Sequence, residues 1–305
     1  MTLPFLVLLA MLLDALIGEP RWLWSRLPHP AVLMGQYVAL LDRWLNKGRA
    51  RRLRGIAALT MLVSSALAFG LLIETLPFAP ILTVLIGAFV LAQRSLADHL
   101  SDVAGALDTS LDEGRLSVAR IVGRDTRDMT EPEVARAAIE SGAENLSDGI
   151  VAPIFWFLLA GLPGLLAYKM VNTADSMIGY RTPKYEQFGW AAARLDDVLN
   201  WVPARLTAAL ILLSHLRPFS WSVVFRDAPL HRSPNAGWPE AAMATVLGIA
   251  LSGPRSYAGE KKDYPFVNVA GRKDLGGKDI RACVGALWRS WVLMGLIVAA
   301  LAIAQ

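Results

Sequence analysis

The sequence predicts an all-α fold, that of a multi-pass helical integral membrane protein with cytoplasmic helical insertions and a re-entrant hairpin. Of its 305 residues, 54% are hydrophobic and only 18% are charged, whereas about 25% are charged in an average soluble domain. The hydrophobic residues also form uncharged stretches that approach the length of a membrane span. These stretches are residues 55–73, 75–93, 149–168 and 290–305.

Three shorter apolar runs, at 3–13, 206–214 and 241–254, fit a span, a re-entrant piece or an interfacial helix, so we expect four to six membrane passes. A basic run precedes the apolar stretch at residue 55, and it comprises Arg43, Lys47, Arg49, Arg51, Arg52 and Arg54. The positive-inside rule places this loop in the cytoplasm. Binding of nucleic acid or a specific lipid is the alternative. Because no aromatic residue interrupts residues 47–54, we interpret the run as a signal that fixes the cytoplasmic side of the membrane. We expect no nucleic-acid partner.

Residues 94–148 are predicted to form a cytoplasmic helical insertion. One helical face is marked by apolar residues at spacings of three and four, namely Leu96, Leu100, Val103, Leu107 and Leu111. A second helix is predicted to begin at Thr130, because Thr-Glu-Pro-Glu supplies a capping hydroxyl, an early proline and the reciprocal carboxylate of Glu133. That helix should continue to about Leu146. Since no internal repeat or flexible linker is visible, residues 1–305 are expected to form one membrane domain.

Three carboxylates, Glu140, Glu144 and Asp148, follow one another at four-residue intervals near the end of this helix. Like charges at that spacing repel each other. A bound cation would remove the conflict, and Asn145 adds a neutral oxygen ligand of the kind that Mg²⁺ accepts. A solvated acidic face is the alternative, but Asp148 directly adjoins the uncharged stretch 149–168.

Two further oxygen-rich edges follow that stretch. Asn172 and Asp175 lie three residues apart on one predicted helical face. Asp196 and Asn200 share another face, where Arg194 is predicted to stack near Asp197. Charged groups at a membrane boundary are functional candidates by default. The three edges together predict a magnesium site.

Topology decides whether these edges can meet. A straight span over 149–168 would place Asp148 and Asp175 on opposite sides of the membrane. The interruption Gly161-Leu162-Pro163-Gly164 instead favours a re-entrant hairpin, which is tolerated where protein covers the broken backbone. Both edges would then face the cytoplasm, and a kinked span is the alternative.

The loop 231–240 carries polar residues just ahead of an apolar helix, so Arg232 and backbone amides could bind an anion there. An ordinary turn is the alternative. His231 could act as a base or serve as a structural hydrogen-bonding residue. Residues 271–279 resemble a phosphate loop, but Asp279 stands where Ser or Thr should bind magnesium, so we interpret them as a plain loop.

Several long strings in this order resemble the CobD/CbiB family of cobalamin biosynthesis, the adenosylcobinamide-phosphate synthases of the inner membrane. The resemblance covers nearly the whole chain, and it is carried by residues 121–126, 138–149, 169–180, 188–205 and 231–242. Near the start, Gly18-Glu19-Pro20 stands where the family usually has Gly-Asp-Pro, a difference that keeps the carboxylate.

The resemblance implies an acid–amine ligase that joins adenosylcobyric acid to (R)-1-aminopropan-2-yl phosphate, with ATP as cosubstrate and Mg²⁺ as cofactor. It also implies a multi-pass protein of the inner membrane that associates with other enzymes of cobalamin synthesis. Because an amine cannot displace a carboxylate oxygen unaided, the carboxylate must first be activated as an acyl phosphate or an acyl adenylate. That chemistry needs metal-bound phosphates and cationic groups, and we expect it on the cytoplasmic side.

Roles follow from this chemistry, since no residue-level assignment is carried over from the family. The predicted metal ligands are Glu140, Glu144, Asn145, Asp148, Asn172, Asp175 and Asp196. The predicted phosphate-binding cations are Arg124, Lys169, Arg181, Arg194 and Arg232. The predicted catalytic groups are Asp148, Asp175, Asp197 and His231. The corrinoid could stack on Trp156, Trp190, Trp201 or Trp238. A magnesium-dependent intramembrane prenyltransferase and a corrinoid transporter are the alternatives that the residues alone leave open.

Overall fold

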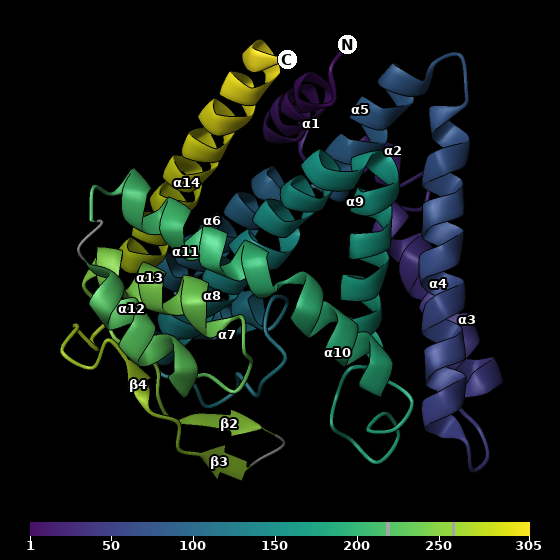
Figure 1. The fold of residues 1–305 in the computed structure, drawn as a ribbon. Coiled ribbons are helices and arrows are strands. Elements are labelled where there is room, and N and C mark those ends of the chain that lie inside the picture. The colour runs from purple at the N-terminus through teal and green to yellow at the C-terminus, as the bar shows by residue number, and fades with distance from the viewer. Residues whose placement is uncertain (218–219, 258–259) are drawn as a thin grey trace. The chain divides into compact units, whose positions relative to one another are not determined.

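The computed structural model describes residues 1–217, 220–257 and 260–305, and it is almost entirely helical (Figure 1). Within these residues, four helical stretches are long and apolar enough to cross a membrane: Arg51–Glu74, Ala79–Thr109, Glu131–Ile178 and Gly277–Ala304. The pair Trp190–Leu199 and Trp201–Ser214, bent by 44°, makes a possible fifth. The predicted class, an all-α multi-pass membrane protein, is therefore confirmed.

The chain packs as two compact units, which are described separately. Unit 1 comprises Met1–Ala92, Asp148–Trp201 and Ile297–Gln305. Its helices are α1 (Leu3–Ile17), α2 (Arg21–Trp24), α3 (Pro30–Leu45), α4 (Arg51–Glu74), α5 (Ala79–Val90), α9 (Ala152–Ile178) and α10 (Trp190–Leu199). A π-helical turn, η1 (Ser147–Val151), leads into α9. The prediction of a single membrane domain is not tested by this division.

Unit 2 comprises Gln93–Ser147 and Val202–Leu296. Its helices are α6 (Gln93–Thr109), α7 (Leu111–Val118), α8 (Glu131–Leu146), most of α11 (Trp201–Ser214), α12 (Trp221–Asp227), the 3-10 turn η3 (Ala228–Leu230), α13 (Gly237–Leu247) and most of α14 (Gly277–Ala304). Short strands form two antiparallel pairs, β1 (Leu251–Ser252) with β4 (Phe266–Val267) and β2 (Arg255–Tyr257) with β3 (Glu260–Lys262).

The helix start predicted at Thr130 is confirmed. Thr130 and Glu133 form the reciprocal capping box, a proline occupies the first turn, and α8 ends at Leu146 as expected. The periodic face before it is divided differently, because α6 ends at Thr109 and Ser110 caps α7, so that Leu111 belongs to the next helix. In α6 the buried face includes Leu100 and Val103.

The predicted break inside 149–168 is also confirmed. Ala160 and Gly161 leave the helical conformation, with Gly161 at φ 65°, and Pro163 follows. The Tyr168 hydroxyl lies 3.0 Å from the carbonyl oxygen of Asp148, which is 20 residues earlier, whereas a straight helix of that length would separate them by about 30 Å. The chain therefore doubles back as a hairpin, and Figure 1 shows the two arms of α9 meeting at the bend.

Helix α4 packs closely on this hairpin. A Cβ at Gly70 would lie 2.5 Å from the Cα of Pro163, so only glycine permits the approach. Small residues commonly allow such close contacts between membrane helices. The broken backbone is thus covered by protein, the condition under which a hairpin is tolerated in a membrane.

Candidate functional site

A hydrogen-bonded polar centre lies at the open end of the hairpin in unit 1, and we call it the Tyr168 centre (Asp148, Tyr168, Asn172, Asp196 and Asn200). The Tyr168 hydroxyl lies 2.8 Å from Asn200 Oδ1 and 3.0 Å from the Asp148 carbonyl. Asn200 Nδ2 donates to Asp196 Oδ2 at 2.9 Å, and Asn172 Nδ2 donates to Asp196 Oδ1 at 3.3 Å. The hairpin thereby joins the predicted oxygen-rich edges that lie in this unit.

The charges around this centre are mainly negative. The carboxylates of Asp148, Asp175 and Asp196 all interact electrostatically with the Tyr168 hydroxyl. The adjacent Lys169 ammonium interacts with Asp148. Such a concentration of carboxylates from separate segments attracts cations, because protein surroundings screen charge less than water does.

A more exposed ion pair lies on α10 in the same unit. Arg194 Nη1 is 3.4 Å from Asp197 Oδ2, and Arg181 interacts electrostatically with Asp197. The predicted proximity of Arg194 to Asp197 is confirmed. The two arginines are exposed and could therefore contact a phosphate without moving buried groups.

Oxygen atoms in the Tyr168 centre and on the nearby Asp175 are ligands of the kind that magnesium accepts. Among the residues that the structure describes, no group of three or more His, Cys, Asp or Glu side chains could hold a metal ion. Magnesium in nucleotide-dependent enzymes is typically held by one or two carboxylates together with phosphates and water. Asp148 and Asp175 could supply these carboxylates, and phosphates and water would complete the coordination in place of further protein ligands.

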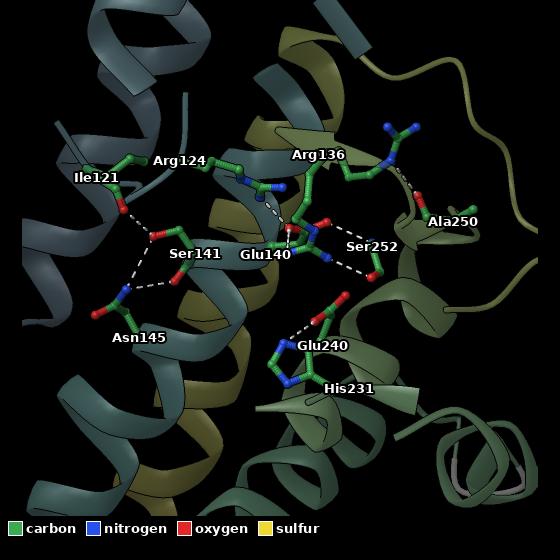
Figure 2. A network of polar contacts seen from close by, with 11 residues as sticks. Ile121, Arg124, Arg136, Glu140, Ser141, Asn145, His231, Glu240, Ala250 and Ser252 are labelled. Carbon is green, nitrogen blue, oxygen red and sulfur yellow. Dashed lines mark hydrogen bonds and ion pairs between the residues drawn. The ribbon is translucent and has the colours of Figure 1, made fainter. Parts of the chain in front are cut away.

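Unit 2 contains a second polar cluster, which we call the Glu140 network (Figure 2). Arg124 donates to Glu140 Oε2, and Arg255 Nη1 lies 3.4 Å from the same oxygen. The backbone N–H of Ser252 donates to Glu140 Oε1 at 2.7 Å. Both carboxylate oxygens therefore have protein partners. Arg124, predicted to bind phosphate, and Glu140, predicted to bind metal, contact each other in this structure.

The next turns of α8 are tied to the loop before it. Ser141 Oγ donates to the carbonyl of Ile121 at 3.0 Å, and Asn145 Nδ2 donates to the carbonyl of Ser141 at 2.9 Å. Arg136 is buried and donates to the carbonyls of Ala250 and Lys273. The Ser141 contact ties the loop that carries Arg124 to α8, and the Arg136 contacts tie α8 to the segments around Ala250 and Lys273 (Figure 2).

His231 and Glu240 form a neutral pair beside this network. Burial, with a smaller contribution from the positive charges of Arg255 and Arg232, lowers the pKa of His231 to about 4. Burial raises the pKa of Glu240 well above its ordinary value, and the Glu140 carboxylate adds to the effect. Their side chains are 3.8 Å apart, so the contact joins a neutral imidazole to a protonated carboxyl group.

The imidazole of His231 is held in one orientation. Its Nδ1 accepts the N–H of Ser233 at 3.0 Å, which assigns the ring proton to Nε2, facing Glu240. The lone pair is therefore engaged, and the predicted role of His231 as a base would require the Ser233 contact to open.

Two further predicted site residues, Glu144 on α8 and Arg232 in the loop before α13, are exposed in unit 2. Because Glu140, Glu144 and Asn145 belong to unit 2 and the other predicted metal ligands to unit 1, a metal site shared by all seven stays a prediction.

Sequence reasoning did not single out several polar residues of these clusters. They are Tyr168, Glu240, Ser252 and Arg255. Glu240 was detectable as a lone carboxylate ahead of an apolar helix, and Tyr168 as a polar group at the end of an apolar stretch. Ser252 lies 112 residues from its partner Glu140, and no local pattern indicates such a contact.

The helices, the hairpin and the two polar clusters define a multi-pass helical membrane protein with buried charged groups. The chain belongs to the CobD/Cbib family, whose model matches residues 7–287. The proteins named cobalamin biosynthesis protein CobD from a Sinorhizobium species and from Rhizobium meliloti strain 1021 are 46% and 47% identical to it. These matches cover 99% and 98% of this chain and 98% and 96% of the relatives. No solved structure matches the chain.

Proposed function

We propose that this protein acts in cobalamin biosynthesis, joining a carboxylate of adenosylcobyric acid to the amine of (R)-1-aminopropan-2-yl phosphate with consumption of ATP. Family membership and the names of the full-length relatives support the pathway. The hydrogen-bonded Tyr168 centre, with which the Asp175 carboxylate interacts electrostatically, supports the chemistry, and it is the observation that carries the proposal.

The reaction needs an activated carboxylate. Attack of the corrinoid carboxylate on ATP gives either an acyl phosphate with release of ADP or an acyl adenylate with release of pyrophosphate. The amine then forms the C–N bond, loses a proton, and expels phosphate or AMP. When bound, magnesium would neutralise the negative charge of the phosphates. The side chains of Asp148 and Asp175 would hold it from the protein side.

Cationic side chains would bind the remaining phosphate charge. In unit 1, Arg181 and Arg194 are exposed next to Asp197. Guanidinium groups suit this role because their planar forks match phosphate oxygens. In unit 2, Arg232 is exposed, whereas Arg124 is engaged with Glu140.

Two exposed indole rings offer a surface for the corrinoid. Trp190 begins α10 and Trp201 begins α11, and they are 37% and 56% exposed. The Arg52 guanidinium group stacks on one face of the Trp190 ring at 3.7 Å, which leaves the other face for the corrinoid. Trp156 has a structural role instead, because its Nε1–H donates to the carbonyl of Leu199 at 3.2 Å. Stacking on exposed aromatic rings would hold a large, partly apolar substrate. The proposed location is the inner membrane, with the site facing the cytoplasm.

The test uses purified protein in detergent with ATP, Mg²⁺, adenosylcobyric acid and the amine phosphate, with adenosylcobinamide phosphate detected by mass spectrometry. Product should require all four additions. Asp175→Asn should lower kcat by roughly 100-fold or more, the range typical of lost electrostatic stabilisation, whereas Asp98→Asn, in an exposed ion pair of unit 2, should not. A rate of ATP hydrolysis that is the same with and without the corrinoid and the amine phosphate would refute the proposal.

Two controls separate the alternative functions. Pyrophosphate release on addition of a polyprenyl diphosphate would instead identify a prenyltransferase. Uptake of an unmodified corrinoid into proteoliposomes would identify a transporter.

A further inference from the structure

Unit 1 contains a small cavity whose lining includes the charged and polar side chains of Glu19, His29 and Lys169. Its volume is about 100 Å³, whereas one water needs about 10–15 Å³. The cavity therefore accommodates several waters or the polar ends of a small molecule. It is too small for a nucleotide or corrinoid, whose sites measure about 300–1,000 Å³.

Local backbone geometry brings Glu19 to this cavity. Gly18 ends α1 with a φ of 59°, and its N–H donates to the Asp14 carbonyl at 2.8 Å. A non-glycine residue rarely adopts this conformation. The chain therefore turns sharply at Gly18, and the next residue, Glu19, lines the cavity while remaining exposed. The Gly-Glu-Pro string noted in the sequence thus has a structural explanation.

His29 offers a hydrogen-bond donor to the cavity. Its Nδ1 accepts the N–H of Ala31 at 3.2 Å, as the cap of α3. Burial lowers the pKa of His29, with Glu19 opposing and Lys169 adding to the effect. The neutral ring therefore carries its proton on Nε2, and the Trp24 ring packs edge-on against it at 4.5 Å.

Lys169 supplies a positive charge. Its half-buried ammonium group makes no hydrogen bond or ion pair with any residue that the structure describes, and it interacts with Asp148 and Glu19 only through longer-range electrostatics. A half-buried ammonium group normally has a close partner. Lys169 also directly follows Tyr168, and Asp148 interacts with both residues, so the cavity adjoins the Tyr168 centre.

We propose that this cavity binds a short-chain amino phosphate, with Lys169 and His29 contacting the phosphate and Glu19 contacting the ammonium group. An ammonium donor and a neutral N–H donor suit anionic oxygens, and a carboxylate suits a protonated amine. Because Lys169 directly follows Tyr168, the phosphate end of such a ligand would lie next to the Tyr168 centre. This inference deepens the proposed function, and it assigns Lys169 to the phosphate of the small substrate instead of to ATP.

Binding is measured by isothermal titration of the purified full-length protein, with and without Mg²⁺ and a non-hydrolysable ATP analogue. The probes are (R)-1-aminopropan-2-yl phosphate, 1-aminopropan-2-ol and inorganic phosphate. The amino phosphate should bind at least about tenfold more tightly than either fragment, since each fragment loses at least one charge-assisted contact. Glu19→Gln and Lys169→Met should each weaken its binding by about tenfold or more.

Matched controls are available in the same unit. Glu186→Gln and Lys184→Met make the same chemical changes at exposed positions that do not line the cavity, and both should bind as the wild type does. In turnover assays, Glu19→Gln should raise the KM for the amine phosphate without changing the KM for ATP.

The outcomes separate this inference from the proposed function. Unchanged binding in Glu19→Gln and Lys169→Met, equally tight binding of inorganic phosphate, or no binding under either condition would overturn the inference, even if turnover occurs. Selective binding that depends on both residues, without any ligation, would support the cavity assignment and count against the proposed reaction.

Discussion

Replacing Tyr168 with phenylalanine removes the one hydroxyl group that ties the two ends of the hairpin together. The ring remains to fill the core, where Tyr168 is 1% exposed. The Asp148 carbonyl and Asn200 Oδ1, which lie 3.0 and 2.8 Å from the hydroxyl, lose this partner. Leaving a buried acceptor unsatisfied costs about 1–3 kcal/mol, while hydrogen bonds between membrane helices average about 0.6 kcal/mol. We expect a destabilisation of about 1–2 kcal/mol.

The assay is a double-mutant cycle with Asn200→Ala, measured by reversible unfolding in detergent. Because the two side chains contact each other, the double variant should be less destabilised than the sum of the single variants, by about 0.5–1.5 kcal/mol. Tyr37→Phe is the control, since the Tyr37 hydroxyl makes no hydrogen bond within the described residues. Additivity within about 0.5 kcal/mol would show that the Tyr168–Asn200 contact does not couple the hairpin to α10.

Three further predictions concern topology, the Glu140 network and pH. Cysteines at Asn145 and Tyr180, both exposed, should react with an impermeant maleimide from the same membrane side, and opposite sides would exclude the hairpin. Glu140→Ala should cost about 3–5 kcal/mol in unfolding experiments because it leaves buried arginines unpaired, whereas Asp98→Ala, in an exposed pair with Arg94, should cost less than about 1 kcal/mol. The pKa of His231 is lowered from 6.5 to about 4 in the folded protein, so as the pH falls the unfolded state takes up a proton at a higher pH than the folded state does. Stability from this residue, about 3 kcal/mol, should be lost as pH falls from about 6.5 to 4. Since the raised pKa of Glu240 acts in the opposite direction, the readout is the pH profile of the wild type minus that of His231→Asn, and identical profiles would contradict the assignment.

Local features of the fold were predictable because they depend on neighbouring residues. The start of α8 follows from the Thr130–Glu133 capping box. The hairpin break follows from Gly161 and Pro163, which disfavour a continuous helix. In both cases the sequence contains the physical cause within a few residues.

The end of the apolar run 241–254 was not predictable in the same way. Helix α13 ends at Leu247, Gly248 adopts a φ of 64°, and the chain enters the short strand β1. Short apolar runs do not distinguish helix from strand by periodicity alone. Here the pairing of β1 with β4 decides the structure.

In the candidate site, too, contacts within one helix were predictable from the sequence, whereas contacts between distant segments were not. Spacing within one helix correctly placed Asp196 next to Asn200 and Arg194 next to Asp197. The hydrogen bond from Asn172 to Asp196 joins α9 to α10, and spacing within one helix does not indicate it. The role of Arg255 in neutralising Glu140 depends on tertiary contacts, which a single sequence does not record.

The Tyr168 centre depends on a residue that has no side chain, Gly70 of α4. Because a Cβ at Gly70 would lie 2.5 Å from the Cα of Pro163, any side chain there would displace the hairpin tip. Close-packed interiors transmit such displacements instead of absorbing them. A shift of the tip would move the second arm, which carries Tyr168, relative to Asp148 on the first. The geometry of the polar centre is therefore set in part by helix packing at Pro163, five residues before Tyr168, and hydrogen bonds such as that to Asn200 complete it.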